Sequence, residues 1–371
     1  MLCASRQGDA DGTDSGIALR VVSEGFATLA SVLVSDFNYE LPEELIAQKP
    51  PETRGASRML VVSRDHQRFH DDKFSNFARY IRPGDCLVLN TTRVFPARLH
   101  GRRNSADGAE VEVLLVRAEM DAEDTWKTLV RPGKRVRTGD TIVFDEALRA
   151  EVIAQGDYGE RTLQFHSTGP LQDAFERLGK VPLPPYIHRE PDDADRERYQ
   201  TVFAEKSGSV AAPTAGLHFT EAMLEACREA GAEIARVTLH VGLGTFAPLR
   251  ENEIAKIELH EEYFEIEAAD AARLAKAKRV FCVGTTSVRT VETAMLRGGF
   301  APISGDTNLF IYPGFRFRAT GAMLTNFHLP QSSLLLLVCA LGGQDLVLAA
   351  YRHAVDERYR FFSYGDCMLI E

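Results

Sequence analysis

The sequence lacks paired cysteines and long apolar runs. Its six cysteines are scattered and never form a C-x-x-C pair, so neither a zinc ribbon nor an iron–sulfur site is indicated, and we expect reduced thiols. The longest apolar run, residues 334–341, is far shorter than the roughly 20 residues that cross a bilayer. We therefore expect no membrane span and a cytoplasmic protein.

The sequence also lacks an excess of basic charge and the common nucleotide-binding motifs. Its formal net charge is −10, which excludes a protein that coats nucleic acid or a membrane surface indiscriminately, so any contact with nucleic acid must be local. No G-x-x-x-x-G-K-[ST] motif occurs, and the glycine-rich loop at 242–244 lacks the third glycine of a dinucleotide fingerprint. P-loop hydrolysis and nicotinamide binding are therefore not indicated.

Strand and helix patterns alternate over most of the chain. With 371 residues and 44% hydrophobic content, the length favours two domains. Strands are predicted at 58–64, 86–90, 233–241, 259–266, 279–283, 308–314 and 322–328. Helices are predicted at 43–48, 72–81, 170–179, 221–230, 268–278, 284–296, 332–341 and 344–357. The alternation predicts an α/β fold: a three-layer α/β/α domain with a mainly parallel sheet, formed by residues 35–94 and 166–371.

Residues 95–165 have a different pattern, with short strands and no good helix. Six strands are predicted at 97–103, 111–117, 126–131, 140–144, 148–154 and 161–166, separated by turn signals. This spacing is typical of a small antiparallel β-barrel, inserted here as a separate domain. Residues 1–34 are polar at their start and without periodicity, and we expect a disordered extension.

Basic residues in the predicted barrel gather in two stretches without acids. They predict a positive face suited to a phosphate backbone, formed by Arg98, Arg102, Arg103, Arg131, Lys134 and Arg135. Glu110, Glu112, Glu119 and Asp121 lie between the two stretches. An ordinary solvated barrel surface is therefore an equally open interpretation.

Two polar loops follow strands of the α/β part, where ligands bind in such folds. Thr285, Thr286 and Ser287 open a helix whose amides and dipole suit a carboxylate or phosphate. Simple N-capping by one of the threonines is the alternative, and Arg289 one turn later favours an anion. In the other loop, Gly242, Gly244 and Thr245 let a ligand approach the backbone.

Three histidines lie beside loops or strand ends with Thr, Asn or Gly neighbours. His218, His240 and His328 have the usual setting of proton-transfer groups, whereas His260 fits a structural role better. A metal triad is the weaker interpretation because none shows the i, i+4 spacing of ligands, and we predict no metal site.

The chain resembles a known family through many blocks in order. They are DFNYELPEELIAQ, LNTTRVFPARL, PLPPYI, EKSGSVAAPTAGLHF, VTLHVGLGTF, VGTTSVRTVE, FIYPGF, TNFHLPQS and YRFFSYGD. From about residue 35 to the C-terminus the sequence is similar to the S-adenosylmethionine:tRNA ribosyltransferase-isomerase family of queuosine biosynthesis. One departure is Ser207, where the family has proline in an EKPG block.

The resemblance implies an enzyme that uses S-adenosylmethionine as a ribosyl donor, without a further cofactor. The acceptor is 7-aminomethyl-7-deazaguanine at the wobble position of tRNA, and the products are epoxyqueuosine in tRNA, adenine and methionine. Proton transfer is expected from His218 and His240, with His328 third. The donor or modified base is expected at Pro213, Thr214, Gly216, Gly242, Gly244, Thr245, Thr285, Thr286, Ser287, Arg289, Asn326, Asn90, Thr92 and Arg93.

Two other classes stay open from the residues alone. An S-adenosylmethionine-dependent tRNA methyltransferase uses the same donor but has a glycine-rich first loop near its N-terminus, which is missing here. A noncatalytic RNA-binding protein needs only the basic barrel face. We expect the partners to be S-adenosylmethionine and a tRNA that carries the aminomethyl-deazaguanine base, with no membrane, and we expect a monomer.

Overall fold

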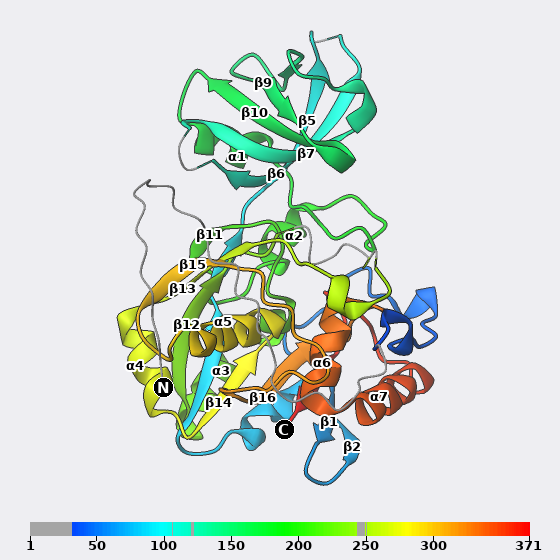
Figure 1. Ribbon diagram of the computed structural model, residues 1–371, viewed down its shortest axis with the longest axis vertical. Helices are drawn as coiled ribbons and strands as arrows, with labels where there is room; N and C mark the ends of the chain where they lie inside the picture. Colours follow the sequence, from blue (N-terminus) through cyan, green and yellow to red (C-terminus); the bar gives the residue numbers. More distant parts are fainter. Residues whose placement is uncertain (1–31, 106, 120–121, 243–248, 250) are drawn as a thin grey trace, which may run out of the picture.

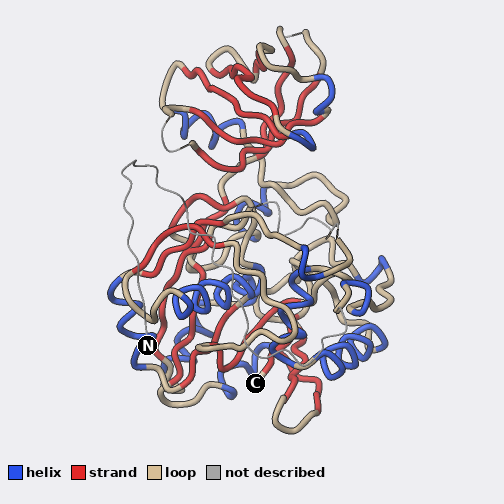
Figure 2. The backbone as a smooth tube through the Cα atoms, viewed as in Figure 1, coloured by secondary structure: helices blue, strands red, loops and turns tan. Residues whose placement is uncertain are grey.

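The computed structural model describes residues 32–105, 107–119, 122–242, 249 and 251–371. They form a large sheet covered by helices and, beyond one end of it, a closed barrel (Figure 1). Figure 2 shows the barrel strands set apart from the strands of the sheet, with loops between the two groups.

The large sheet has nine strands in the order β15-β13-β12-β3-β14-β16-β17-β1-β2. In chain order these are β1 (Arg58–Ser63), β2 (Arg68–Lys73), β3 (Asp85–Asn90), β12 (Glu233–Leu239), β13 (Glu262–Ile266), β14 (Arg279–Val283), β15 (Ile303–Thr307), β16 (Thr320–Asn326) and β17 (Cys367–Ile370). The central strands β12, β3, β14 and β16 pair in parallel, as do β17 and β1. The other pairs are antiparallel. The sheet is therefore mixed, and the predicted parallel arrangement applies to its centre and not to its edges.

Helices cover both faces of the sheet, which confirms the predicted α/β class. Along β3, Cys86 and Val88 contact one apolar cluster while Leu87 and Leu89 contact the other, because successive side chains of a strand point to opposite faces. The first cluster includes residues from four helices, α4 (Ala268–Lys276), α5 (Thr285–Leu296), α6 (Ser333–Gly342) and α7 (Gln344–Asp356). The second is covered by α3 (Glu221–Glu229) and the 3-10 helix η3 (Phe74–Tyr80).

The barrel has the six strands that the sequence predicts. They are β5 (Arg98–Arg103), β6 (Glu110–Ala118), β7 (Thr125–Arg131), β8 (Thr141–Val143), β9 (Leu148–Gln155) and β10 (Glu160–Ser167), all paired antiparallel. Helix α1 (Leu171–Leu178) packs on the barrel through Phe175, which is fully buried with the barrel core. The limits of a separate domain at residues 95 and 165 remain predictions.

Several local predictions are wrong. Residues 308–314, predicted as a strand, form a loop. The Leu309 carbonyl accepts a hydrogen bond from Arg289 Nε (3.0 Å), and the Leu309 N–H donates to Thr307 Oγ1 (3.2 Å), so neither group bonds to a neighbouring strand. The predicted helix at 72–81 is instead the end of β2 followed by the 3-10 helix η3, in which Phe74 and Phe77 are aligned by the three-residue period and both are buried. The predicted helix at 43–48 is the short 3-10 helix η2 (Glu43–Leu45).

Some pairings had no signal in the sequence. The strands β2, β15 and β17 were not predicted. Neither were the short strands β4 (Thr92–Val94) and β11 (Lys206–Ser209), which pair with each other in parallel. Short helices also occur at η1 (Val34–Asp36), η4 (Gly133–Arg135), η5 (Asp157–Gly159), α2 (Asp193–Arg198), η6 (Thr214–His218) and η8 (Ile254–Lys256).

The predicted N-terminal extension lies mostly outside the described residues. Its last residues belong to the folded part, because Leu33 forms a β-bridge with Glu253 and Val34 is buried. Across the described ranges, no single helix is long and apolar enough to cross a membrane. Helices α6 and α7 reach that length and composition only together, and the chain bends by 116° between them.

Candidate active site

A cavity of about 110 Å³ lies where β14 and β16 reach their carboxyl ends. Its walls come from six segments far apart in the sequence. They are Tyr186, Ala212–Ala215, Val241, Gly284–Thr286, Thr325–Leu329 with Ser332 and Leu334, and Phe362–Ser363. Of the predicted substrate-binding residues, this cavity brings together Pro213, Thr214, Thr285, Thr286 and Asn326. The position agrees with the general rule that α/β sheets bind ligands beyond the carboxyl ends of their strands.

The N-terminus of α5 opens into this cavity. Gly284 is the N-cap residue, with φ of 87°, and no side chain caps the helix, so the N-capping alternative is wrong. Thr286 is 8% exposed, and its Oγ1 is buried with no hydrogen-bond partner among the described residues. A buried hydroxyl beside unused helix amides is a site for a ligand with hydrogen-bonding or negatively charged groups.

Ser287 does not face the cavity. It is completely buried, and its Oγ donates at 2.8 Å to the carbonyl of Val283, the last residue of β14. Gly216 is likewise packed away from the cavity, since a Cβ there would lie 2.7 Å from Phe203 and Thr201. Gly244 and Thr245 lie outside the described residues.

His218 lies behind the cavity wall rather than on it. Its Nδ1 accepts a hydrogen bond from Ser57 Oγ (2.8 Å), and its Nε2–H donates to Asn326 Oδ1 (3.3 Å). Asn326 in turn donates from Nδ2 to the carbonyl of Phe362 at 2.8 Å. Burial lowers the pKa of His218 to about 4. The ring is therefore neutral at pH 7, with both nitrogens engaged.

His328 lines the cavity directly. Its Nε2 shares a hydrogen bond of 2.8 Å with Thr325 Oγ1, and its backbone N–H donates to Tyr351 Oη at 3.1 Å. Burial lowers the pKa of His328 to about 3. A neutral imidazole thus lies on the same wall as Asn326.

His240 is half-buried and away from the other two histidines. Its Nδ1 lies 2.7 Å from Thr92 Oγ1, and its ring stacks on Tyr263 with centroids 5.7 Å apart. Burial lowers its pKa, partly offset by Glu265. Gly208 packs against the ring, since a Cβ there would be 2.7 Å from His240 Nε2. The three predicted histidines therefore do not share one cavity.

Two further predicted residues lie near His240. Asn90 joins β3 to β12, because its side chain donates to Leu239 O (2.9 Å) and accepts from Leu239 N (3.1 Å). Arg93 is exposed on β4. Asn90 thus has a structural place, whereas Arg93 is accessible to a large partner.

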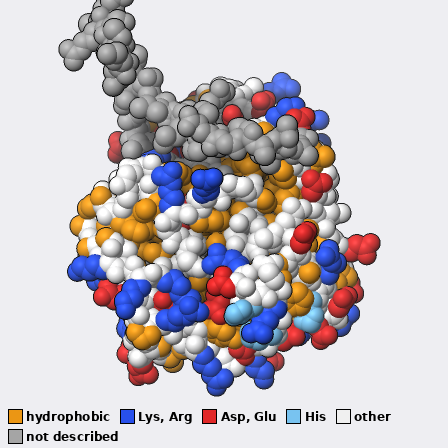
Figure 3. Space-filling model, turned by 60° about the horizontal axis from the view of Figure 1, so that its bottom comes forward, with side chains coloured by type: hydrophobic (Ala, Val, Ile, Leu, Met, Phe, Trp, Pro, Cys, Tyr) orange, Lys and Arg blue, Asp and Glu red, His pale blue; other side chains and the backbone are white. Residues whose placement is uncertain are grey.

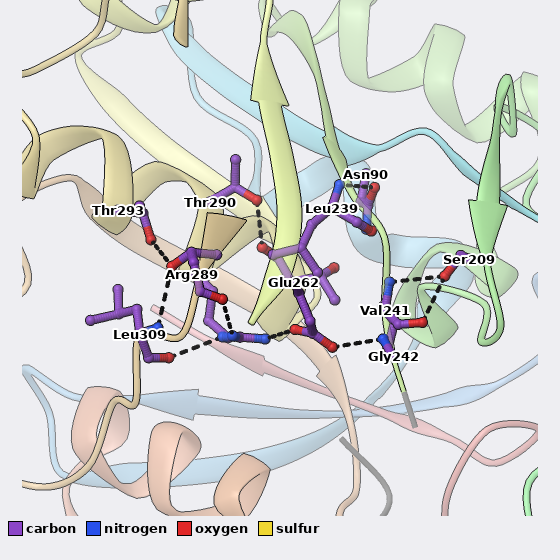
Figure 4. A network of polar contacts seen from close by, with 12 residues as sticks. Asn90, Ser209, Leu239, Val241, Gly242, Glu262, Arg289, Thr290, Thr293 and Leu309 are labelled. Atoms are coloured by element: carbon purple, nitrogen blue, oxygen red, sulfur yellow. Dashed lines mark hydrogen bonds and ion pairs between the residues drawn. The ribbon is translucent and has the colours of Figure 1, made fainter. Parts of the chain in front are cut away.

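Arg289 is committed to an internal network (Figure 4). It forms an ion pair with Glu262, and both side chains are at most 6% exposed. Glu262 also accepts from the N–H of Gly242 at 2.8 Å. The network therefore joins α5 to the chain that follows β12, and Arg289 fixes this wall of the site rather than offering a free cation to the cavity.

The barrel places its predicted basic residues in two groups. Arg98, Arg102 and Arg103 lie within 4 Å of Glu112, Glu110 and Asp140 respectively. Arg131, Lys134 and Arg135 are exposed at β7 and η4. Figure 3 brings forward the side of the molecule opposite the barrel, and there basic and acidic side chains are interspersed.

Among the cavity residues that the sequence analysis missed are Tyr186, Phe362 and Ser363. Tyr186 Oη and Ser363 Oγ are 2.6 Å apart, and the rings of Tyr186 and Phe362 have centroids 4.6 Å apart. Phe362 has a φ of 66°, which non-glycine residues rarely adopt. The proline-rich segment before Tyr186 was the available signal, because rigid loops often form site walls.

Comparisons with known proteins identify the family of the chain. The family model described as queuosine biosynthesis protein matches residues 34–370. The chain is 56% identical over 352 residues to the S-adenosylmethionine:tRNA ribosyltransferase-isomerase of Solibacter usitatus, covering 91% of this chain and 99% of that protein. The enzyme of the same name from Symbiobacterium thermophilum is 51% identical over 343 residues, with the same coverage.

A solved structure is similar as well. The crystal structure of an S-adenosylmethionine tRNA ribosyltransferase from Thermotoga maritima is 39% identical, covers 91% of this chain and all of that chain, and superposes with a TM-score of 0.53. With the match of the family model over nearly the whole length, these similarities show that the chain belongs to the queuosine biosynthesis protein family.

Proposed function

We propose that this protein transfers the ribosyl moiety of S-adenosylmethionine to 7-aminomethyl-7-deazaguanine at the wobble position of tRNA and isomerises it. The products are epoxyqueuosine in tRNA, adenine and methionine. The names of the relatives support this activity. In this chain, the observation that carries it is the buried Thr286 hydroxyl, which has no partner in the described residues at the N-terminus of α5.

The α5 end of the cavity suits the methionine carboxylate of the donor. The first amides of the helix and its dipole favour a negative charge, and the Thr286 hydroxyl adds a donor. Typical small-molecule sites measure about 300–1,000 Å³, so the cavity of about 110 Å³ encloses one end of the donor. Asn326 and His328 lie together on another wall of the cavity, where they would face the sulfonium and ribose of the donor.

The chemistry requires proton transfers and no redox step. The sulfonium acidifies the neighbouring C5′ hydrogens, so a base removes one of them. Adenine leaves with a proton, and the acceptor amine attacks after losing one. Because the sulfonium already activates the donor, no further cofactor takes part. S-adenosylmethionine is itself consumed as a substrate.

His328 is the histidine whose position best suits proton transfer with the donor. It lines the cavity on the same wall as Asn326, and burial keeps its ring neutral. His240 lies beside Thr92, near the exposed Arg93, and this position favours a role toward the modified base or its phosphate. His218 has both nitrogens engaged, which favours a positioning role.

We further propose that a single chain binds tRNA in the cytoplasm. The five described cysteines are free and buried, which supports a reducing compartment. Local basic groups on the barrel, among them Arg131, Lys134 and Arg135, support contact with the tRNA backbone.

Product analysis tests the proposal. Purified protein is incubated with S-adenosylmethionine and tRNA carrying the aminomethyl-deazaguanine base, and tRNA with ordinary guanine at that position is the matched control. We expect adenine and methionine in equal amounts, and epoxyqueuosine among the digested nucleosides, only with the modified tRNA. S-adenosylhomocysteine would instead identify a methyltransferase, and binding without turnover a noncatalytic RNA-binding protein.

A further inference from the structure

Two turns meet at one end of the barrel and expose an aromatic side chain. Turn η4 follows β7, and turn η5 joins β9 to β10. They pack closely, since a Cβ on Gly133 would lie 2.9 Å from Gly159 Cα. Tyr158 in η5 is 80% exposed, whereas Ile153 and Val202, the other large exposed apolar side chains of the described residues, are 44% and 37% exposed. We call residues 131–137 and 156–160 the barrel tip.

The backbone at Tyr158 has an unusual conformation. Its φ and ψ are 54° and 23°, in the left-handed region, which residues other than Gly, Asn and Asp rarely adopt. Such a conformation persists only where the surrounding structure holds it, and it is frequent at functional sites. Here it points a large ring outward from a turn.

A single buried arginine holds both turns. Arg161 is 7% exposed. It donates from Nε to Val136 O (2.9 Å) and from Nη2 to Gly133 O, the two ends of η4. From Nη1 it donates to Gly156 O (3.4 Å) and Glu160 O (2.5 Å), the two ends of η5. The backbone of the barrel tip is therefore held in one conformation before any ligand binds, and its exposed side chains start from fixed positions.

The charge of the barrel tip is locally positive. Four exposed basic residues are present, Arg131, Lys134, Arg135 and Arg137. Across the described ranges, no carboxylate lies within 4 Å of their charged nitrogens, unlike those of Arg98, Arg102 and Arg103. Two exposed acids, Asp157 and Glu160, flank Tyr158, and a Cβ on Gly156 would lie 2.9 Å from Glu160 Oε2, so this carboxylate is folded over the turn.

We propose that the barrel tip binds single-stranded RNA, with one unpaired base stacked on Tyr158 and the adjoining phosphates at Lys134 and Arg135. Every base offers a face for stacking on an exposed aromatic ring, and neighbouring cations track the backbone. This inference deepens the proposed function, since it rests on tRNA as the substrate and assigns one of its contacts. An unpaired base of a tRNA loop has the required chemistry.

Direct binding tests the proposal independently of turnover. The probe is a fluorescently labelled, unmodified tRNA transcript with guanine at the wobble position, titrated with the full-length protein at several salt concentrations. Because stacking of one base contributes about 1–3 kcal/mol, we expect Tyr158→Ala to raise the Kd at least about fivefold. Tyr158→Phe, which keeps the ring, stays within about twofold of wild type. The Lys134→Ala/Arg135→Ala double variant weakens binding and lowers the salt slope by about 1.5.

Matched controls on β9 separate this site from general surface effects. Ile153→Ala removes another exposed apolar side chain, and Arg149→Ala removes an exposed cation from the same barrel. We expect both to bind tRNA within about twofold of wild type. Equal Kd values for Tyr158→Ala and Tyr158→Phe, or equal losses in the controls, would overturn the proposal. Tyr158-dependent binding by a protein that forms no adenine would support this inference while refuting the proposed reaction.

Discussion

His218 and Asn326 form a buried pair in which the imidazole Nε2–H donates to the amide oxygen at 3.3 Å. Because Ser57 occupies the other ring nitrogen, the imidazole has one orientation and Asn326 has one acceptor oxygen. The amide nitrogen is thereby turned toward Phe362, whose carbonyl it reaches at 2.8 Å. Asn326 and Phe362 both line the cavity, so His218 acts on the site through its neighbours.

Substitution of His218 separates positioning from proton transfer. His218→Gln keeps an amide donor near the position of Nε2 but cannot transfer a proton, whereas His218→Ala removes the donor. We expect His218→Gln to retain kcat within about tenfold, and His218→Ala to lose at least ten times more, since it leaves a buried acceptor unpaired at a cost of about 1–3 kcal/mol. Steady-state kinetics with donor and tRNA check this.

Ser57→Ala is the milder companion variant, because it removes only the bond to Nδ1. We expect a rise in the KM for the donor with little change in kcat. Equal inactivity of His218→Gln and His218→Ala, in proteins with the same melting temperature, would contradict positioning and restore His218 as a proton-transfer residue.

Stability is expected to fall in mild acid. Burial lowers the pKa of His218 from 6.5 to about 4 and that of His328 to about 3, so the unfolded chain binds more protons between these values and pH 6.5. The contribution of these two neutral histidines to the free energy of unfolding is complete above pH 6.5 and is lost as the pH falls toward 4. For His218 alone this amounts to roughly 2 kcal/mol between pH 7.5 and pH 5. Urea unfolding at both pH values should show a smaller difference in His218→Gln and an unchanged one in His66→Gln, at an exposed position.

Thr286 should affect donor binding and stability in opposite directions. Its buried hydroxyl has no partner in the described residues, so Thr286→Val removes an unsatisfied group and is expected to raise the free energy of unfolding by about 1 kcal/mol. The same change removes a donor to the substrate carboxylate, and the KM for S-adenosylmethionine should rise about 10- to 100-fold. Thr286→Ser should keep the KM near wild type.

Ser287→Ala is the matched control for Thr286, since the Ser287 hydroxyl is already bonded to the carbonyl of Val283 at the end of β14. We expect it to lower stability by about 1 kcal/mol and to leave the KM for the donor unchanged. A large KM effect at Ser287 and none at Thr286 would show that the ligand approaches the helix from another side.

Removing one partner of the buried ion pair between Glu262 and Arg289 should lower the free energy of unfolding strongly. Glu262→Ala leaves the guanidinium of Arg289 buried without its carboxylate, and we expect a loss of roughly 3–5 kcal/mol in unfolding free energy. Glu225→Ala, which breaks an exposed pair with Arg228, should cost at most about 1 kcal/mol. Thermal and urea unfolding compare the two.

A double variant tests the reason for that loss. If the stranded charge causes it, Glu262→Leu/Arg289→Met should be more stable than Glu262→Ala. A double variant as unstable as the single one would mean that the contacts to Gly242 and Leu309 dominate instead.

The sequence by itself determined the local elements and the family. The short apolar run of β3 is typical of a strand buried on both faces, and closely spaced turns divide the barrel into its six strands. The prediction of a strand at 308–314 was wrong because the apolar residues there suit a strand, whereas the backbone of Leu309 bonds to the side chains of Arg289 and Thr307. Bonds of the backbone to side chains leave no periodic signal in the sequence.

Only the tertiary structure decided which residues of the motifs face the ligand. Thr286 and Ser287 are neighbours with similar side chains, but successive helix residues point about 100° apart, so Thr286 faces the cavity while Ser287 bonds to the end of β14. Three histidines with equal sequence settings separated in the same way, one on the cavity wall, one behind it and one beside Thr92. Sequence spacing determines which residue types are near each other, whereas the direction of each side chain depends on packing between segments hundreds of residues apart.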